Sequence, residues 1–416
     1  MAEYETPTID IRYGAYNGTK TNSAYFWHYL SRIYHWRQNT GLIPNIEKMD
    51  SLTMQVDCGK RIKAVKELLL TSAYDFQYTF EDTDFITSVL CYKNDPMVPV
   101  IFIREPKSDI ASGIFRLFND ITLNRKGSSA RFIGEAYLVK DIDDVYRVQS
   151  EAGTRFFTDG IAGSVEDGIR WIETLPSVYT QNTVKYVRYY GDEKVLHPKR
   201  FNIITESAET LRSFSEIKDN MRQAGITDIV LPVDHVATRI FHHDREDAIL
   251  EIVKLTHMYP WGAYNIDEMD SSTNPVRNVY NMPERHSPAK VFTAGNCGAF
   301  LRFLSTRPAP TETFCENFGR SLHHIAYDVK EDDMDGPDNH NIDTVVSYLK
   351  KNGFNFVDNL TGTKAEGLRQ VFSKRSPHTG WVTEYVERFG GFHGFFTRKN
   401  VAFLTQAAGK DEGVIK

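Results

Sequence analysis

Residues 370–388 read QVFSKRSPHTGWVTEYVER and predict a β-hairpin. Along its second strand, residues 381–388, the side chains of Val382, Glu384 and Val386 alternate onto one face. A strand face that carries valines is expected to meet a core, where an ionised carboxylate is costly unless it is paired or binds a metal. The hairpin therefore predicts that Glu384 lies beside a cation.

Two upstream segments, residues 231–240 and 321–329, are also predicted strands, and each contains a histidine. An alanine follows two residues after His235 and two residues after His324, on the same face, so neither imidazole is crowded. Two histidines and one carboxylate match the facial triad that leaves three positions open on non-heme Fe(II). The sequence therefore predicts a metal site made of His235, His324 and Glu384, although these ligand types also suit other divalent ions.

Length and composition bound the class of protein. A chain of 416 residues is expected to divide into two domains, and 41% hydrophobic with 25% charged residues is ordinary for a soluble globular protein. The net charge of -6 argues against nucleic acid and acidic membranes as partners, so small molecules are expected instead. Four scattered cysteines, an acidic start without a secretory signal, and no apolar run of about 18 residues predict a cytoplasmic protein.

The first half, residues 1–192, is predicted to be a mixed α/β module. Its clearest elements are a helix at 23–38, strands at 86–92, 98–103, 130–139 and 184–190, and a helix at 141–152. None of its strands carries a histidine with a small residue two positions later. This half is therefore expected to bind no metal.

The second half is expected to follow a linker at residues 193–230 that contains one helix at 207–224. Its further elements are helices at 244–258, 341–351 and 400–408 and a strand at 300–305. The order of strands and helices recurs in both halves. This predicts a weak internal repeat in which the halves share shape rather than residues.

Three motifs give the second half a family likeness: His324-Ile325-Ala326, the run QVFSK that begins at Gln370, and Glu384-x-x-x-Arg388 followed by Gly- and Phe-rich sequence. These motifs resemble those of the 4-hydroxyphenylpyruvate dioxygenase family, within the vicinal oxygen chelate superfamily. The likeness in the order of elements covers nearly the whole chain. It implies an α+β fold of two vicinal-oxygen-chelate modules with paired βαβββ units, of which the C-terminal one, residues 231–416, forms an open barrel around a metal.

The resemblance also implies which residues form the site. It assigns Fe(II) as the cofactor, His235, His324 and Glu384 as its ligands, and Gln370 to the wall of the pocket. The family's Pro-x-Asn-Glu stretch is replaced here, which leaves Ser305 as the nearest polar side chain. The family's lid is replaced by a longer run, and the apolar wall that excludes water is predicted to contain Phe372, Phe392, Phe395 and Phe396.

The implied reaction is the oxidative decarboxylation of an aromatic 2-oxo acid, 4-hydroxyphenylpyruvate or a close analogue, coupled to hydroxylation of the same molecule by O2. Three alternatives stay open: a 4-hydroxymandelate-forming enzyme, an extradiol dioxygenase that cleaves catechols, and a protein that uses the fold to bind without oxygen chemistry. The expected assembly is a homodimer or a homotetramer.

Other polar residues near these strands receive structural interpretations. His323 faces the opposite side of its strand from the predicted ligand, so it is interpreted as structural or as a support for that ligand. Glu387 is out of step with the predicted carboxylate ligand and is expected to be solvated. His242 and His243 are interpreted as loop or helix-start residues. Arg388 either pairs with a carboxylate or is a surface charge at the end of its strand.

Overall fold

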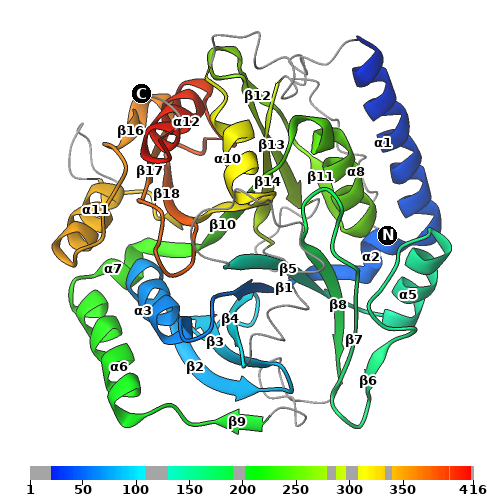
Figure 1. The fold of residues 1–416 in the computed structure, drawn as a ribbon, viewed down its shortest axis with the longest axis horizontal. Helices are drawn as coiled ribbons and strands as arrows, with labels where there is room; N and C mark the ends of the chain where they lie inside the picture. The colour runs from blue at the N-terminus through cyan, green and yellow to red at the C-terminus, as the bar shows by residue number, and fades with distance from the viewer. Residues whose placement is uncertain are drawn as a thin grey trace.

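The computed structural model describes residues 20–107, 130–190, 202–278, 287–296, 308–332, 340–392 and 394–413. Ser305 and the strand predicted at residues 300–305 lie outside these ranges. Within them the chain forms two nine-stranded sheets with helices packed around them (Figure 1). The predicted mixed fold of two modules is confirmed.

The first sheet has the order β6-β7-β8-β5-β1-β4-β3-β2-β9. Its strands are β1 (Ile46–Gln55), β2 (Tyr74–Glu81), β3 (Phe85–Tyr92), β4 (Val100–Pro106), β5 (Arg131–Val139), β6 (Ala162–Ser164), β7 (Ile169–Glu173), β8 (Thr183–Tyr189) and β9 (Asn202–Ile204). Its helices are α2 (Leu42–Asn45), α3 (Arg61–Thr71) and α5 (Ile142–Glu151). Within the predicted linker, β9 pairs with β2 and α6 (Ala208–Gln223) packs against α3, so this segment adds to the first module.

The second sheet has the order β11-β13-β14-β10-β15-β18-β17-β16, with β12 paired to β13. Its strands are β10 (Val230–Arg239), β11 (Met258–Pro260), β12 (Tyr264–Ile266), β13 (Ser271–Asn278), β14 (Ala289–Gly295), β15 (Ser321–Val329), β16 (Thr361–Thr363), β17 (Leu368–Phe372) and β18 (Val382–Arg388). Its helices are α7 (Ile226–Ile229), α8 (Arg245–Leu255), α10 (Pro310–Phe318), α11 (Asn341–Lys351) and α12 (Arg398–Asp411). The predicted hairpin is present, because β17 and β18 pair antiparallel.

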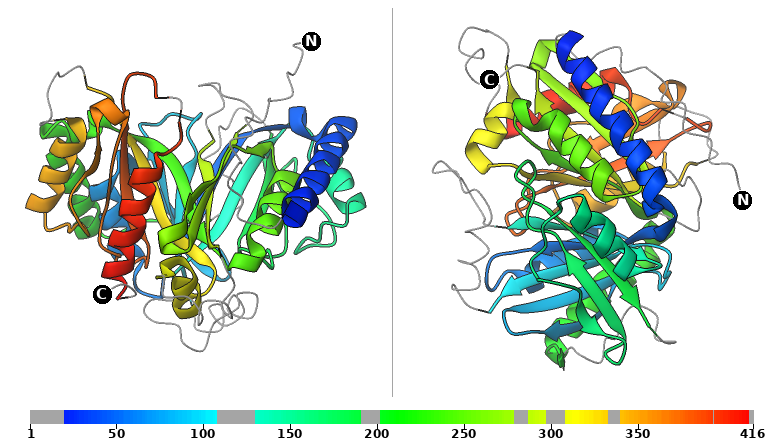
Figure 2. Two further views of the ribbon diagram at one scale, coloured as in Figure 1. Left: turned by 90° about the horizontal axis from the view of Figure 1, so that it is seen from above. Right: turned by 90° about the vertical axis from the view of Figure 1, so that its right-hand side faces the viewer.

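The N-terminal helix of the first half packs against the second half. Helix α1 (Lys20–Thr40) comes first in the described chain but packs along α8 of the second half (Figure 2). Its Arg37 donates hydrogen bonds to the carbonyl oxygens of Val253, Thr256 and Met258 at 2.7 to 2.9 Å. A buried arginine needs such acceptors, so the helix is fixed to the opposite half. No helix among the described residues has the length and apolar character to span a bilayer.

The sheets repeat one another in detail. The order β4-β1-β5-β8-β7 in the first sheet matches β14-β10-β15-β18-β17 in the second. A glycine with left-handed backbone dihedrals and a four-residue helix precede both β1 and β10. The register shifts in the β1–β5 and β10–β15 pairs also lie at corresponding residues. This alignment places Ser51, Gly134 and Lys185 of the first sheet where the second sheet has the predicted ligands His235, His324 and Glu384.

Candidate metal centre

The three predicted ligands converge at one point inside the second sheet. His235 on β10, His324 on β15 and Glu384 on β18 are 0%, 6% and 1% exposed, so solvent does not separate them. Glu384 Oε2 lies 3.0 Å from His235 Nε2 and 3.2 Å from His324 Nε2, and the two Nε2 atoms are 3.1 Å apart. Three residues that are far apart in the sequence therefore present one potential ligand atom each to a common position.

Strand register explains why they meet. Ala326 on the central strand β15 is opposite His235 on β10 and opposite Glu384 on β18. Because side chains of registered residues share a face, the imidazole and the carboxylate approach each other across a methyl group. Ala237 has the same position relative to His324. The alanine that follows each histidine thus provides the space that the sequence pattern predicted.

A chain of hydrogen bonds fixes which nitrogen of each histidine carries a proton. Asp234 Oδ2 lies 2.6 Å from His235 Nδ1, and a carboxylate can only accept, so Nδ1 is the donor and Nε2 faces the site. On the other side, Glu412 Oε1 lies 3.2 Å from His323 Nε2, and His323 Nδ1 lies 2.8 Å from His324 Nδ1. If neutral His323 donates to Glu412, it must accept from His324, which leaves the Nε2 lone pair of His324 directed into the site.

Electrostatics shows that the site requires positive charge. Burial alone would lower the pKa of His235, but the carboxylates of Glu384 and Asp234 raise this pKa to about 9. Burial opposes ionisation of Glu384, yet the two histidines hold its pKa at about 2. Burial lowers the pKa of His324, which favours its neutral form. Glu384 therefore stays ionised, and a proton or a metal ion must neutralise it.

One atom favours a metal ion over a proton. Glu384 Oε2 is buried and accepts no hydrogen bond within the described residues, although two imidazole nitrogens are near it. An orphaned carboxylate oxygen is costly in a core, and a divalent cation placed among Oε2 and the two Nε2 atoms would satisfy all three. Two histidines and one carboxylate suit Fe(II) among several divalent ions. The residues thus fit the metal that the sequence implied.

The remaining predicted site residues lie around this centre in different ways. Gln370 donates from Nε2 to Glu384 Oε1 at 2.7 Å, and Asn400 of α12 donates to Gln370 Oε1 at 3.1 Å. Gln370 therefore holds the carboxylate in place, and the terminal helix holds Gln370. Neither the order of motifs nor local spacing in the sequence indicated Asn400.

The predicted apolar wall is present in part. The ring of Phe372 packs on His324 with centroids 4.8 Å apart, and the rings of Phe395 and Phe396 pack on His235 at 5.5 and 5.3 Å. Phe372 and Phe396 also line a cavity of about 40 Å³, together with His324 and Glu384. Phe392 packs over the backbone at Gly367 and Gly394 instead.

The lining of this cavity also includes polar groups. Ser271, Thr273, Thr293, Thr311 and Thr405 contribute hydroxyl groups to its lining, together with Arg239. Arg239 is 4% exposed and donates to Glu412, the C-cap residue of α12, at 2.7 Å. The lining of the cavity therefore combines aromatic side chains with hydrogen-bonding groups.

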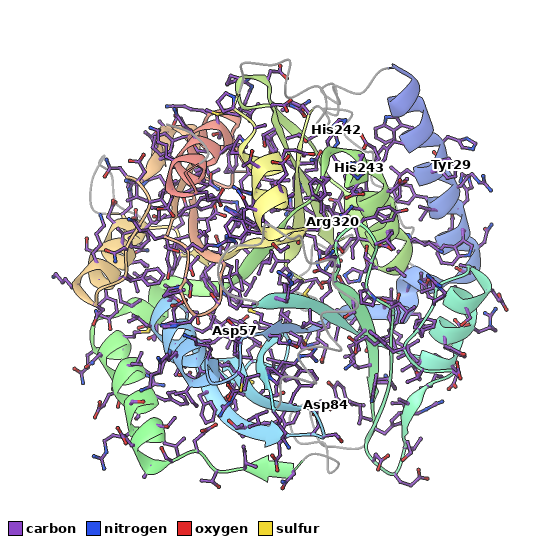
Figure 3. All side chains as sticks on the ribbon, in the orientation of Figure 1. Tyr29, Asp57, Asp84, His242, His243 and Arg320 are labelled. Atoms are coloured by element: carbon purple, nitrogen blue, oxygen red, sulfur yellow. The ribbon has the colours of Figure 1, made fainter. Side chains whose placement is uncertain are left out.

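Residues interpreted as peripheral have clearer roles in the structure. Arg388 is directed at Asp234, with Nη1 2.7 Å from Oδ1 and Nη2 3.1 Å from Oδ2, so it holds the carboxylate that orients His235. His323 supports His324, as predicted. His242 and His243 lie just before α8, as predicted (Figure 3). His242 Nδ1 contacts the carbonyl oxygen of Gly295 at 3.0 Å.

The prediction that Glu387 is solvated is wrong. Its side chain is 0% exposed, because α11 covers the face of β18 that lies opposite the metal ligands. Its Oε2 accepts from the backbone N–H of Ile342 at 3.0 Å, in the first turn of α11. Burial raises the pKa of Glu387 to about 7. Asp332 and His340 lie beside it, so this carboxylate belongs to a second polar cluster at a helix N-terminus.

Comparison with solved structures shows that the chain shares its fold with proteins of known structure. The chain is similar to a mutant of 4-hydroxymandelate synthase from Streptomyces coelicolor, with a TM-score of 0.59 and 14% identity over 88% of this chain and 99% of that chain. It is also similar to a xylose isomerase-like TIM barrel/4-hydroxyphenylpyruvate dioxygenase fusion protein, with a TM-score of 0.51 and 13% identity over 88% of this chain and 53% of that chain. The resemblance to 4-hydroxyphenylpyruvate dioxygenase-like proteins is thus confirmed in the fold. No family model and no curated protein sequence matches the chain.

Proposed function

We propose that this chain is an Fe(II)-dependent dioxygenase that acts on an aromatic 2-oxo acid, with His235, His324 and Glu384 as the metal ligands. The observation that carries the proposal is the orphaned oxygen Glu384 Oε2, which lies 3.0 and 3.2 Å from two imidazole nitrogens. The fold shared with 4-hydroxymandelate synthase and with a 4-hydroxyphenylpyruvate dioxygenase fusion supports the choice of reaction.

The internal symmetry of the second sheet supports a metal ion with vacant coordination positions. The β10–β14 and β15–β18 pairs are equivalent, and Val291 opposite Ala237 corresponds to Glu384 opposite Ala326. A fourth ligand would therefore come from position 291, but the side chain there is apolar and lines the cavity. Three protein ligands leave three positions of an octahedral ion vacant, enough for a bidentate 2-oxo acid and for O2.

The surrounding residues would do the orienting and shielding. When bound, Fe(II) would supply the redox chemistry that couples decarboxylation of the 2-oxo acid to hydroxylation of the same molecule. Gln370 fixes the orientation of Glu384 through a 2.7 Å hydrogen bond. Phe372 and Phe396 limit the access of water to the site. Holding both reactants at one centre could contribute about 7 to 11 kcal/mol through orientation.

We also infer that the first module, residues 1–192, binds no metal at the equivalent position. Ser51, Gly134 and Lys185 stand where the second module has its two histidines and its glutamate. Lys185 Nζ lies 3.3 Å from Glu173 Oε2, so a fixed ammonium group supplies the positive charge there. The catalytic module would then be residues 231–416.

The test combines metal content with oxygen chemistry. The purified protein should contain or bind one Fe(II), consume O2 and release carbon dioxide with 4-hydroxyphenylpyruvate. Glu384→Ala should lose both metal and turnover. Glu366→Gln is a suitable control, because Glu366 pairs with Lys399 at the surface, away from the predicted ligands. Unchanged metal content together with unchanged turnover in Glu384→Ala would reject the assignment.

The similarity to 4-hydroxymandelate synthase makes benzylic hydroxylation the second candidate reaction. Both reactions consume O2 and release carbon dioxide, so the hydroxylated product must be identified by mass spectrometry and NMR. A ring-hydroxylated product supports the first reaction, and a benzylic alcohol supports the second. Bound zinc with no O2 consumption would instead indicate a binding protein that uses this fold.

A further inference from the structure

A second cavity lies between the two modules and takes no part in the candidate metal centre. Its volume is about 260 Å³. One wall contains residues 174–184, which form the connection from β7 to β8 and the start of β8 in the first module. The other wall contains residues of α8 and β14 of the second module. Every residue of this lining lies in the part of the chain that the structure describes.

The lining of this cavity contains buried polar groups with unused hydrogen-bonding capacity. Lys290 Nζ lies 2.9 Å from Glu135 Oε2, and the two side chains are 2% and 0% exposed. The second oxygen, Glu135 Oε1, is buried and accepts no hydrogen bond, and Asn182 Nδ2 is buried and donates none, within the described residues. Unpaired buried groups of this kind are costly, so a bound partner that satisfies them would be favoured.

Glu135 and Asn182 line the same cavity. Glu135 on β5 is registered with Val184 on the parallel strand β8, and Asn182 lies two residues before Val184. Asn182 is the residue directly before β8. The free carboxylate oxygen and the free amide N–H therefore face one space, and a small molecule can reach both.

The internal repeat supplies a control for this interpretation, because the same interface occurs twice. The hydroxyl of Tyr186 donates to Leu255 O at 2.6 Å, and its counterpart Tyr385 donates to Thr71 O at 2.5 Å. Likewise, Ser177 lies against Glu251 of α8, as Ser376 lies against Glu67 of α3. The cavity belongs to the first of these two equivalent contacts.

At the second contact the equivalent positions are apolar and buried. Lys290, Glu135 and Asn182 correspond to Ile101, Ile325 and Trp381, which are 0%, 0% and 3% exposed. All three belong to the main apolar core. This kind of interface can therefore be stabilised by apolar packing alone. Lys290, Glu135, Asn182 and the cavity that they line are not needed to join the modules.

We propose that this cavity binds a small neutral molecule of about the size of an indole ring, with an N–H donor next to a carbonyl acceptor, as in an aromatic primary amide. The N–H would donate to Glu135 Oε1 and the carbonyl would accept from Asn182 Nδ2. The ligand is neutral because Lys290 already compensates the charge of Glu135, and a further buried charge would be unpaired. The expected size follows from the equivalent contact, where the indole ring of Trp381 stands in place of the smaller Asn182 side chain.

Binding of benzamide to the full-length protein tests the proposal, with benzoate as the matched probe that lacks the donor. Ligand-observed NMR and calorimetry should show saturable binding of benzamide and binding of benzoate that is weaker by at least about tenfold. Asn182→Trp, which introduces the residue of the equivalent contact, should weaken benzamide binding by at least about tenfold while the protein stays folded.

Two further variants keep the test decisive. Asn182→Leu removes the donor without adding a large ring, so it replaces Asn182→Trp if that variant does not fold, and it should weaken binding similarly. The double variant Lys290→Ile with Glu135→Ile carries the residues of the equivalent contact and should abolish benzamide binding. Equal binding by wild type and Asn182→Leu overturns the proposal. So does a crystal soaked in benzamide that contains only water at Glu135 Oε1.

Discussion

Replacing Val291 by glutamate would test the internal symmetry of the candidate metal centre. Val291 is 1% exposed, lines the cavity, and occupies the position on β14 that Glu384 occupies on β18. If the two halves of this sheet are equivalent around the ion, Val291→Glu adds a fourth ligand. The variant should then bind metal more tightly and lose oxygen chemistry, because only two positions stay open where a bidentate 2-oxo acid and O2 need three.

The cost of burying the new carboxylate can be estimated from Glu387, a buried glutamate in the same sheet. Burial raises the pKa of Glu387 from its ordinary value of 4.5 to about 7. A rise of this size corresponds to about 3 kcal/mol at a pH above 7. The metal-free form of Val291→Glu should therefore lose about 3 kcal/mol of unfolding free energy at pH 8. A metal ion that ligates the new carboxylate should restore about the same amount.

The assay is chemical denaturation at pH 8 with and without saturating Co(II), which reports metal affinity without oxygen chemistry. The gain on adding Co(II) should be about 3 kcal/mol larger in Val291→Glu than in wild type. Val291→Gln has the same shape without the charge, so it should show no comparable extra gain. If Co(II) stabilises Val291→Glu no more than it stabilises Val291→Gln, the two halves of the sheet are not equivalent around the ion.

Three further predictions follow from the polar groups around the ligands. Asp234→Asn should weaken Co(II) binding by about 10- to 100-fold in calorimetric titration, because the amide can donate to His235 and reverse its tautomer. As a control, Asp328→Asn changes a second carboxylate beside Arg388 and should alter the Co(II) affinity by less than about threefold. Glu387→Gln should flatten the pH dependence of stability. Because the pKa of Glu387 is about 7 in the folded protein, the wild type should lose up to about 3 kcal/mol of unfolding free energy as pH rises from 4.5 to beyond 7. Denaturation at pH 5 and pH 8 would show this loss in the wild type and not in the variant. Glu412→Ala should lower unfolding free energy by about 3–5 kcal/mol in guanidinium denaturation, because it leaves the charge of Arg239 buried and unpaired; a loss below about 1 kcal/mol would show that this pair does not hold α12.

The positions of the metal-ligand candidates could be predicted from sequence because strand alternation is a strong local signal. A histidine and an alanine two residues apart share a face whatever the rest of the fold does. The same parity placed Glu384 on the core side of its hairpin. What the sequence could not provide was the register between strands, and it is the register that sets Ala326 opposite both His235 and Glu384.

Other features were missed for physical reasons. Strands β13 and β14 were not predicted, because β13 reads SSTNPVRN and its polar side chains are buried by tertiary contacts that no local pattern shows. The alternation along β18 puts Glu387 on the face opposite Glu384, but it cannot show that α11 covers that face and buries Glu387. The internal repeat also shares residues and not shape alone: Ala136-Tyr137 on β5 recurs as Ala326-Tyr327 on β15.

The repeat shows why a metal centre in one sheet need not have a counterpart in the other. At the equivalent place in the first sheet, Lys185 pairs with Glu173 and lowers the pKa of that carboxyl, although burial would raise it. The positive charge that the second sheet would take from a metal ion is thus part of the chain in the first. Gly134, at the place of His324, could not become a histidine, because a Cβ there would lie 1.9 Å from the carbonyl oxygen of Thr183. Substituting side chains alone would not build a second metal centre, since β5 and β8 would first have to move apart.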